Sequence, residues 1–232
     1  MRIYSKRLRS AYGSFDRMKK YSLNQAIGLL KQMPPAKFNE SADLAFYLGV
    51  DPKQSDQMVR GTVLLPHGTG KSVRVIVFCK GELERVAREE GVEVVGGEDL
   101  VKKIEGGWMD FDVVISTPDM MKIVSRLGKI LGPKGLMPSP KAGTVTMDLA
   151  KTIKEIKAGR VEFKTDKQGN MNVAVGKLSF SEQALCDNSQ GVIDAVIHSR
   201  PATVKGHFIQ GIVLSSTMGP GFRLELADLN VN

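Results

Sequence analysis

Apolar and polar positions follow two different patterns along the chain, and the change of pattern divides the sequence into three segments. In the middle segment, short apolar runs alternate with amphipathic helical stretches, which is typical of an open α/β sheet. The clearest run is VRVIVFCK, whose near-continuous apolar character indicates a strand buried on both faces. Strands and helices are predicted in alternation at 73–80, 81–91, 92–97, 98–107, 112–117, 118–130 and 149–159. Pro118 is expected to open the helix at 118–130, and Gly159 is the expected C-cap of the helix at 149–159.

The first and last segments have a different pattern, with longer helices and strands of alternating polarity. Ser22 is a candidate N-cap for a helix that the Pro34-Pro35 pair ends, and Ser181 is a candidate N-cap for a second helix. The stretch 161–176 predicts a hairpin with Gly169-Asn170 in its turn. Helices are predicted at 22–33 and 181–200, and strands at 42–50, 59–66, 161–166, 171–176, 207–218 and 222–226.

These patterns predict two domains of different class. Each flanking segment has about 70 residues, which is too few for either to be expected to fold well alone. Together, residues 1–67 and 160–232 give a discontinuous α+β domain, an antiparallel sheet with two helices. A Rossmann-like open α/β domain is inserted into it at 68–159.

Charge adds a candidate partner class to this picture. The net charge is +8, but it is concentrated in two zones. Residues 1–20, a basic arm predicted to be a helix or partly ordered, hold seven Lys/Arg against Asp16 alone. Residues 122–159 hold eight against Asp148 and Glu155. Two concentrated basic zones favour a polyanion as partner, although a solvated surface with a frayed tail explains the same charges.

Features that the sequence lacks give expectations about the cellular compartment of the protein and about metal binding. There is no apolar run of 18 residues and no apolar stretch behind the basic N-terminus, so neither a membrane span nor a secretory signal is expected. The two cysteines, Cys79 and Cys186, are expected to be buried free thiols in a reducing cytoplasm. The three histidines, His67, His198 and His207, are far apart, so no metal site is expected.

Two motifs favour a nucleotide-dependent enzyme at first sight, and neither is complete. HGTGKS at 67–72 has Leu65 where the phosphate-binding loop needs glycine, and a strand follows it instead of a helix. The turn Lys80-Gly81-Glu82 lacks the further glycines of a dinucleotide-binding loop. We therefore expect no cofactor and no catalysis, and interpret Gly68 and Gly70 as a flexible hinge between the domains.

Three loops are better candidates for chemistry. LGKILGPKGLMPSPKAGT at 127–144 combines glycines and prolines with Lys129, Lys134 and Lys141, a composition suited to phosphate-backbone contact or an elaborate loop with incidental charge. AKFNES at 36–41 carries an aromatic ring that either stacks on a base or packs in the core. SSTMGPG at 215–221 offers hydroxyls and backbone amides to RNA, or is a simple strand-ending turn.

These segments closely resemble the bacterial form of the ribosomal protein L-one family, the stalk protein beside the ribosomal exit site. The matching blocks occur in family order over about residues 1–223. They are AKFNES, VRGTVLLPHGTGKSVRV, GWMDFDVVISTPDMM, LGKILGPKGLMPSPKAGTV, EIKAGRVEFKTDKQGN and LSSTMGPG.

The resemblance implies that the split domain is the principal rRNA-binding body. Lys164 stands where relatives have arginine, which keeps the charge but loses bidentate geometry. Residues 181–199 and the tail after Gly221 follow the family less closely, so no site is transferred to them. By motif match, the implied rRNA contacts are Lys37, Phe38, Glu40, Ser41, Lys164, Asp166, Lys167, Ser216, Thr217, Met218, Gly219 and Pro220.

The resemblance further implies a structural protein of the large ribosomal subunit that binds rRNA at the mobile exit-site stalk. It implies assistance in releasing deacylated tRNA, and repression of translation through binding to the protein's own messenger RNA. Outside the ribosome we expect a monomer without membrane association. The alternatives are a nucleotide-dependent enzyme built on the inserted domain and a non-selective basic nucleic-acid-binding protein.

Overall fold

The computed structural model describes residues 5–229, apart from the side chains of Ser55 and Asp228. Its contacts divide the chain into two compact units. Unit 1 consists of the described parts of Met1–Gly70 and Gly159–Asn232, and unit 2 is Lys71–Ala158. Residues 1–4 of the predicted arm lie outside the described residues, and the arm continues as helix α1 (Lys6–Gly13).

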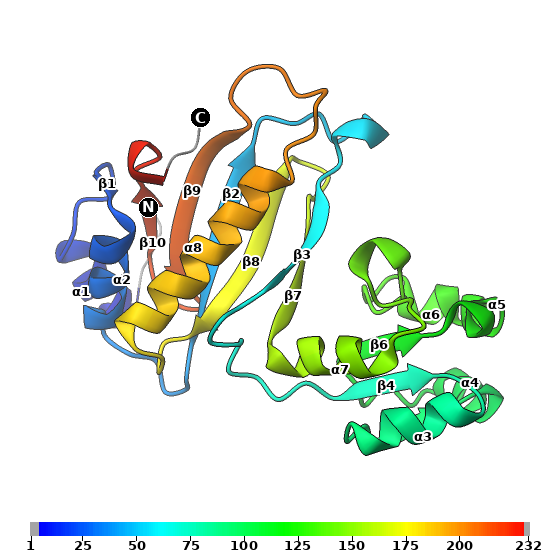
Figure 1. The fold of residues 1–232 in the computed structure, drawn as a ribbon. Coiled ribbons are helices and arrows are strands. Elements are labelled where there is room, and N and C mark those ends of the chain that lie inside the picture. The colour runs from blue at the N-terminus through cyan, green and yellow to red at the C-terminus, as the bar shows by residue number, and fades with distance from the viewer. Residues whose placement is uncertain (1–4, 230–232) are drawn as a thin grey trace. The chain divides into compact units, whose positions relative to one another are not determined.

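A five-stranded sheet forms the centre of unit 1 (Figure 1). Only the short first strand is parallel to its neighbour, and the other three pairings are antiparallel. The spatial order is β1 (Lys20–Tyr21), β10 (Gly221–Leu224), β9 (Ile209–Ser216), β2 (Ser41–Leu48) and β8 (Asn170–Lys177). The predicted α+β character of this part of the chain is confirmed.

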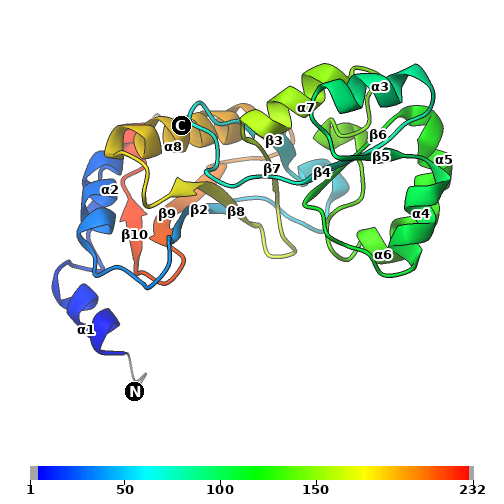
Figure 2. The ribbon, with the colours of Figure 1, turned by 90° about the horizontal axis from the view of Figure 1, so that it is seen from below.

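Two helices cover one face of this sheet. The helix α8 (Glu182–His198) lies across it in both views (Figures 1 and 2), and α2 (Leu23–Gln32) packs beside α8 in the same apolar core. The predicted caps mark both starts correctly, but only Ser181 accepts a hydrogen bond through its hydroxyl, from Ala184 N; Ser22 makes no such bond. Along β2 every second residue is buried, because alternate side chains of a strand point to the core.

The predicted hairpin at 161–176 is wrong in its pairing. The chain does turn there, since the Asp166 carboxylate accepts hydrogen bonds from Gln168 N and Asn170 N, both at 2.8 Å. However, β7 (Arg160–Lys164) pairs antiparallel with β3 (Arg60–Leu64) in a separate two-stranded sheet, while β8 pairs with β2. The physical reason is that β7 forms its hydrogen-bonded pairs with β3 and β8 forms its own with β2. Both partners lie in the first segment of the chain, so the two strands belong to different sheets.

Unit 2 is a three-layered α/β structure, as the alternating pattern predicted. Its three strands are parallel, and all four residues of the central one are buried. The helices α3 and α7 cover one face of the sheet, and α4 with the helical segment after β6 covers the other. The elements are β4 (Val75–Phe78), α3 (Glu82–Glu89), β5 (Val94–Gly96), α4 (Glu98–Glu105), β6 (Val113–Ser116) and α7 (Leu149–Ala158), with sheet order β5-β4-β6.

The helix predicted at 118–130 is broken into short turns. Pro118 does open it, but the Ser125 hydroxyl donates to Met121 O at 2.6 Å, and such a bond back to the preceding turn disturbs a regular helix. The pieces are η2 (Pro118–Met120), α5 (Met121–Val124), η3 (Ser125–Leu127) and α6 (Gly128–Leu131). The remaining short helices are η1 (Ser55–Gln57), η4 (Pro140–Ala142) and η5 (Ala227–Leu229).

The segment HGTGKS is not a phosphate-binding loop, because it is followed by the strand β4. Its first part is held against α8 by the buried Asn188. The Asn188 side chain accepts from His67 N at 3.0 Å and donates to Gly68 O at 3.0 Å. Gly159, the predicted C-cap of α7, has φ +110°, and a Cβ there would lie 2.4 Å from Gly68 Cα, so this position leaves no room for a side chain.

Candidate nucleic-acid interface

Two of the predicted loops meet at one end of the five-stranded sheet. Because β2 and β9 are antiparallel neighbours, the start of β2 lies beside the end of β9, with Ala42 opposite Ser216. Ser41 and Thr217 join the two loops directly. Thr217 N donates to Ser41 O, and Ser41 N donates to the Thr217 hydroxyl, both at 3.0 Å. We call residues 36–41 and 215–221 the loop cluster.

A buried carboxylate, that of Glu40, holds the loop cluster together. Its side chain is 2% exposed, and it accepts hydrogen bonds from the Ser216 hydroxyl and from Met218 N, both at 2.8 Å. It also accepts from Ala36 N at 3.1 Å. Burial by itself raises the pKa of Glu40, but these three hydrogen bonds and nearby Arg7 together outweigh it, so the pKa is lowered. In this conformation Glu40 organises the loops and does not face outward.

Other side chains of the loop cluster point to solvent. Phe38 is 54% exposed and Met218 is 52% exposed, so Phe38 is not the core residue that one interpretation of its sequence allowed. Lys37 and Thr217 are also exposed. The ring of Phe38 and the thioether of Met218 are therefore accessible to a ligand.

The remaining members of the loop cluster shape it. Ser216 and Pro220 are buried, and Ser41 and Gly219 are half-buried. Gly219 is needed at its position because a Cβ there would lie 2.3 Å from the Ser216 hydroxyl oxygen. The turn therefore packs against its own strand end.

Two cations beside the loop cluster were missed by the sequence interpretation. Lys177, at the end of β8, donates to the Ser41 hydroxyl at 2.8 Å. Arg7, on α1, donates to Pro34 O at 3.0 Å and to Met218 O. The only signal for Arg7 was the general basicity of the arm, and Lys177 had none, because these contacts join residues that are far apart in sequence.

The third predicted group, Lys164, Asp166 and Lys167, does not join the loop cluster. Leu48 N, at the far end of β2, donates to Gly169 O at 3.0 Å, so this turn lies at the opposite end of the strand. Lys164 and Lys167 are exposed. The pKa of Asp166 is lowered by the backbone N–H groups of Asn170 and Gln168, so this carboxylate is an ionised turn-forming group.

The basic loop of unit 2 presents its lysines on the surface of that unit. Lys129 lies on α6, Lys134 follows it, and Lys141 lies in η4. All three side chains are exposed. They form a set of cations on unit 2 that is separate in the chain from the loop cluster of unit 1.

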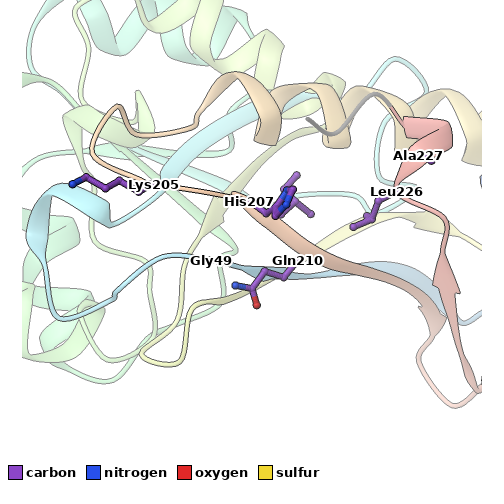
Figure 3. Close-up of a pocket in the computed structure, with 7 residues that line it drawn as sticks. Gly49, Lys205, His207, Gln210, Leu226 and Ala227 are labelled. Atoms are coloured by element: carbon purple, nitrogen blue, oxygen red, sulfur yellow. The ribbon is translucent and has the colours of Figure 1, made fainter.

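Two cavities of about 590 Å³ in unit 1 lie away from the loop cluster. One of about 590 Å³ lies at the start of β9, the end of the sheet opposite to the loop cluster (Figure 3). In Figure 3 the Lys205 side chain extends away from His207, so these two polar groups do not converge on one point. The lining residues are Gly49, Lys205, His207, Ile209, Gln210, Leu226 and Ala227.

Reactive groups elsewhere in the described chain are not arranged for catalysis. Among residues 5–229 no group of three His, Cys, Asp or Glu side chains could hold a metal ion. Burial raises the pKa of the Cys79 thiol to about 11, and burial likewise raises the pKa of Cys186. A raised pKa keeps a thiol protonated and unreactive. Within the described residues, no helix is both long and apolar enough to span a bilayer.

The chain thus consists of an α+β unit, which carries the exposed loop cluster, and an α/β unit. The model of the ribosomal protein L1p/L10e family matches residues 30–220. The chain belongs to this family, which confirms the resemblance inferred from its motifs, and its role is that of a structural ribosomal protein and not of an enzyme.

Two curated relatives resemble the chain over almost its whole length. One, named large ribosomal subunit protein uL1, from Protochlamydia amoebophila (strain UWE25), is 49% identical over 224 residues, which cover 97% of this chain and 95% of the relative. The protein of the same name from Chlamydia abortus (strain DSM 27085 / S26/3) is 49% identical over 229 residues, 99% of each chain.

Proposed function

We propose that this protein is a cytoplasmic component of the large ribosomal subunit and binds large-subunit rRNA at the exit-site stalk through the loop cluster. The observation that carries the proposal is the exposure of Phe38 and Met218 on a frame fixed by buried Glu40. An exposed ring on a rigid frame can stack on an unpaired base, and the thioether of Met218 can pack against the same base or its neighbour. The exposed Lys37 beside them is placed to contact phosphate.

The cations outside the loop cluster have a different part in this proposal. Lys164 and Lys167 at the far end of β2, and Lys129, Lys134 and Lys141 on unit 2, add sequence-independent attraction to the phosphate backbone. Asp166 contributes by shaping the turn that carries Lys167. Specificity and general affinity therefore reside in different residues.

The proposal includes two further roles in translation. The protein assists release of deacylated tRNA at the exit site, and it represses its own translation by binding a similar structure in its messenger RNA. Outside the ribosome it is a monomer and does not associate with membranes. A non-selective basic protein is the competing hypothesis. Competition between a transcript of the rRNA stalk and bulk duplex DNA at physiological salt separates the two, since only the first predicts that DNA fails to displace the transcript.

Replacing Phe38 with alanine is expected to weaken binding of the stalk transcript by about 1–3 kcal/mol, the scale of one base–aromatic stack. Thr217→Ala is expected to act on the same scale, through loss of its hydroxyl at the loop junction. Filter-binding titration measures both. Met147→Ala is the control, because Met147 is also an exposed apolar side chain, at 60%, but lies on unit 2. Unchanged affinity in a folded Phe38→Ala variant contradicts the proposal.

Lys134→Ala is expected to change the salt dependence of binding without changing its selectivity. Loss of one phosphate contact lowers the slope of log K against log salt by roughly 0.7–0.9. Titrations at several salt concentrations measure this slope. Lys103→Ala, which removes an exposed lysine from α4, is the matched control and is expected to leave the slope unchanged. A change in preference among RNA sequences is the result that argues against this role for Lys134.

A further inference from the structure

The basic arm reaches the loop cluster through one specific side chain, that of Arg7. The helix α1 is capped by the Ser5 hydroxyl, which accepts a hydrogen bond from Leu8 N, and it is held to unit 1 by Ala11, which is buried in the core. From this helix the Arg7 guanidinium donates to Pro34 O and to Met218 O. Its side chain is 25% exposed, so it is not a free surface charge.

Arg7 and Glu40 bind the two backbone polar groups of the same residue, Met218. Glu40 accepts from Met218 N at 2.8 Å, and Arg7 donates to Met218 O. Both backbone polar groups of Met218 are thus bound by charged groups, while its side chain stays 52% exposed. Arg7 also lies 3.9 Å from a Glu40 oxygen, and both line a cavity of about 290 Å³ that Pro34 and Ser216 border.

From this arrangement we propose that Arg7 is a positioning residue for specific RNA binding, which displays Met218 by bridging its carbonyl to Pro34. This inference rests on the proposed function of the loop cluster. A guanidinium is suited to the task because its planar fork carries several donors and can serve two carbonyls at once. A lysine at this position keeps the charge, but its three donors share one nitrogen, whereas Arg7 reaches Pro34 O with Nη1 and Met218 O with Nη2.

The competing explanation is that the arm attracts RNA only as diffuse positive charge. Under that explanation all arm cations are equivalent. Arg9 lies on the same helix and is exposed, and no hydrogen bond or ion pair of its side chain occurs within the described residues. It is therefore the matched control for Arg7.

The test compares the charge-conserving variants Arg7→Lys and Arg9→Lys in the full chain. We expect Arg7→Lys to bind the stalk transcript about tenfold more weakly, the effect of losing a hydrogen bond to a charged group, while Arg9→Lys binds as the wild type does. The salt slope should be unchanged in both, because no charge is lost. Amide hydrogen exchange of Met218 in the free protein should accelerate in Arg7→Lys alone, because Met218 then keeps only one of its two charged partners, Glu40.

Equal affinities of Arg7→Lys and Arg9→Lys, with Met218 exchange unchanged, overturn the inference. If Arg7→Lys fails to fold, Arg7→Gln assayed against Arg9→Gln decides in the same way. Phe38→Ala in the same titrations separates this inference from the proposed function. Weakened binding by Phe38→Ala with no effect of Arg7→Lys rejects Arg7 alone, whereas no effect of either rejects the role of the whole loop cluster.

Discussion

Replacing Glu40 with alanine is expected to lower the free energy of unfolding by about 3–5 kcal/mol, the usual cost of removing one partner from a buried charged network. Three donors, Met218 N, the Ser216 hydroxyl and Ala36 N, then remain without their acceptor, and Arg7 loses its nearby carboxylate. Urea unfolding at neutral pH measures the change.

The control for this prediction is Glu162→Ala. Glu162 pairs with Arg60 at 2.6 Å, but the pair is partly solvated, and such pairs contribute roughly 0–1 kcal/mol. An equal loss of stability in the Glu40 and Glu162 variants would show that the buried carboxylate is no more important than a surface one. Loss of RNA binding should accompany the loss of stability at Glu40, because the same hydrogen bonds hold Met218.

The contribution of Glu40 also depends on pH in a defined direction. Its folded pKa is lowered below the ordinary value of 4.5, through hydrogen bonds that outweigh the opposing effect of burial. A lowered carboxyl pKa gives stability that is present above the unfolded pKa and is lost as pH falls through the folded pKa. The stability difference between wild type and Glu40→Gln is therefore expected to be largest near neutrality and to shrink in acid. A difference that grows on acidification contradicts this sign.

Replacing Gly159 with alanine is expected to destabilise the protein by about 2–5 kcal/mol. The backbone there has φ +110°, a conformation that costs other residues about 1–3 kcal/mol. In addition, a Cβ would lie 2.4 Å from the Cα of Gly68, so the backbone itself must move. That movement disturbs the bond from Leu65 N to Gly159 O, which is 3.3 Å long.

Thermal unfolding of Gly159→Ala and Gly28→Ala checks this prediction with a matched pair. Gly28 lies inside α2, and a Cβ added there meets no atom within 4 Å. Its replacement removes freedom from the unfolded chain and is expected to stabilise the protein by about 0.4–1 kcal/mol. Similar melting temperatures for the two variants would mean that the approach of Gly159 to Gly68 imposes no strain.

Local sequence signals correctly predicted those elements of the fold whose physical cause is also local. Ser181 caps α8, Gly159 ends α7, and the apolar run at 73–80 contains a fully buried parallel strand. The same signals failed at 161–176, where a turn sequence between two strands predicted a hairpin. The turn formed, but strand pairing depends on partners in the distant first segment, which no local pattern encodes.

The properties of the loop cluster likewise fall into those that the sequence determined and those that only the tertiary structure decided. By itself the sequence determined the alternation of elements, the split of the chain into two classes of pattern, the basic zones and the family motifs that contain Phe38 and Met218. Only the tertiary structure decided that Glu40 is a buried organiser and that Arg7 holds the loop that displays Met218. The physical reason is sequence separation: the bond from Ser216 to Glu40 spans 176 positions and that from Arg7 to Met218 spans 211, so each exists only after the sheet has brought its strand ends together.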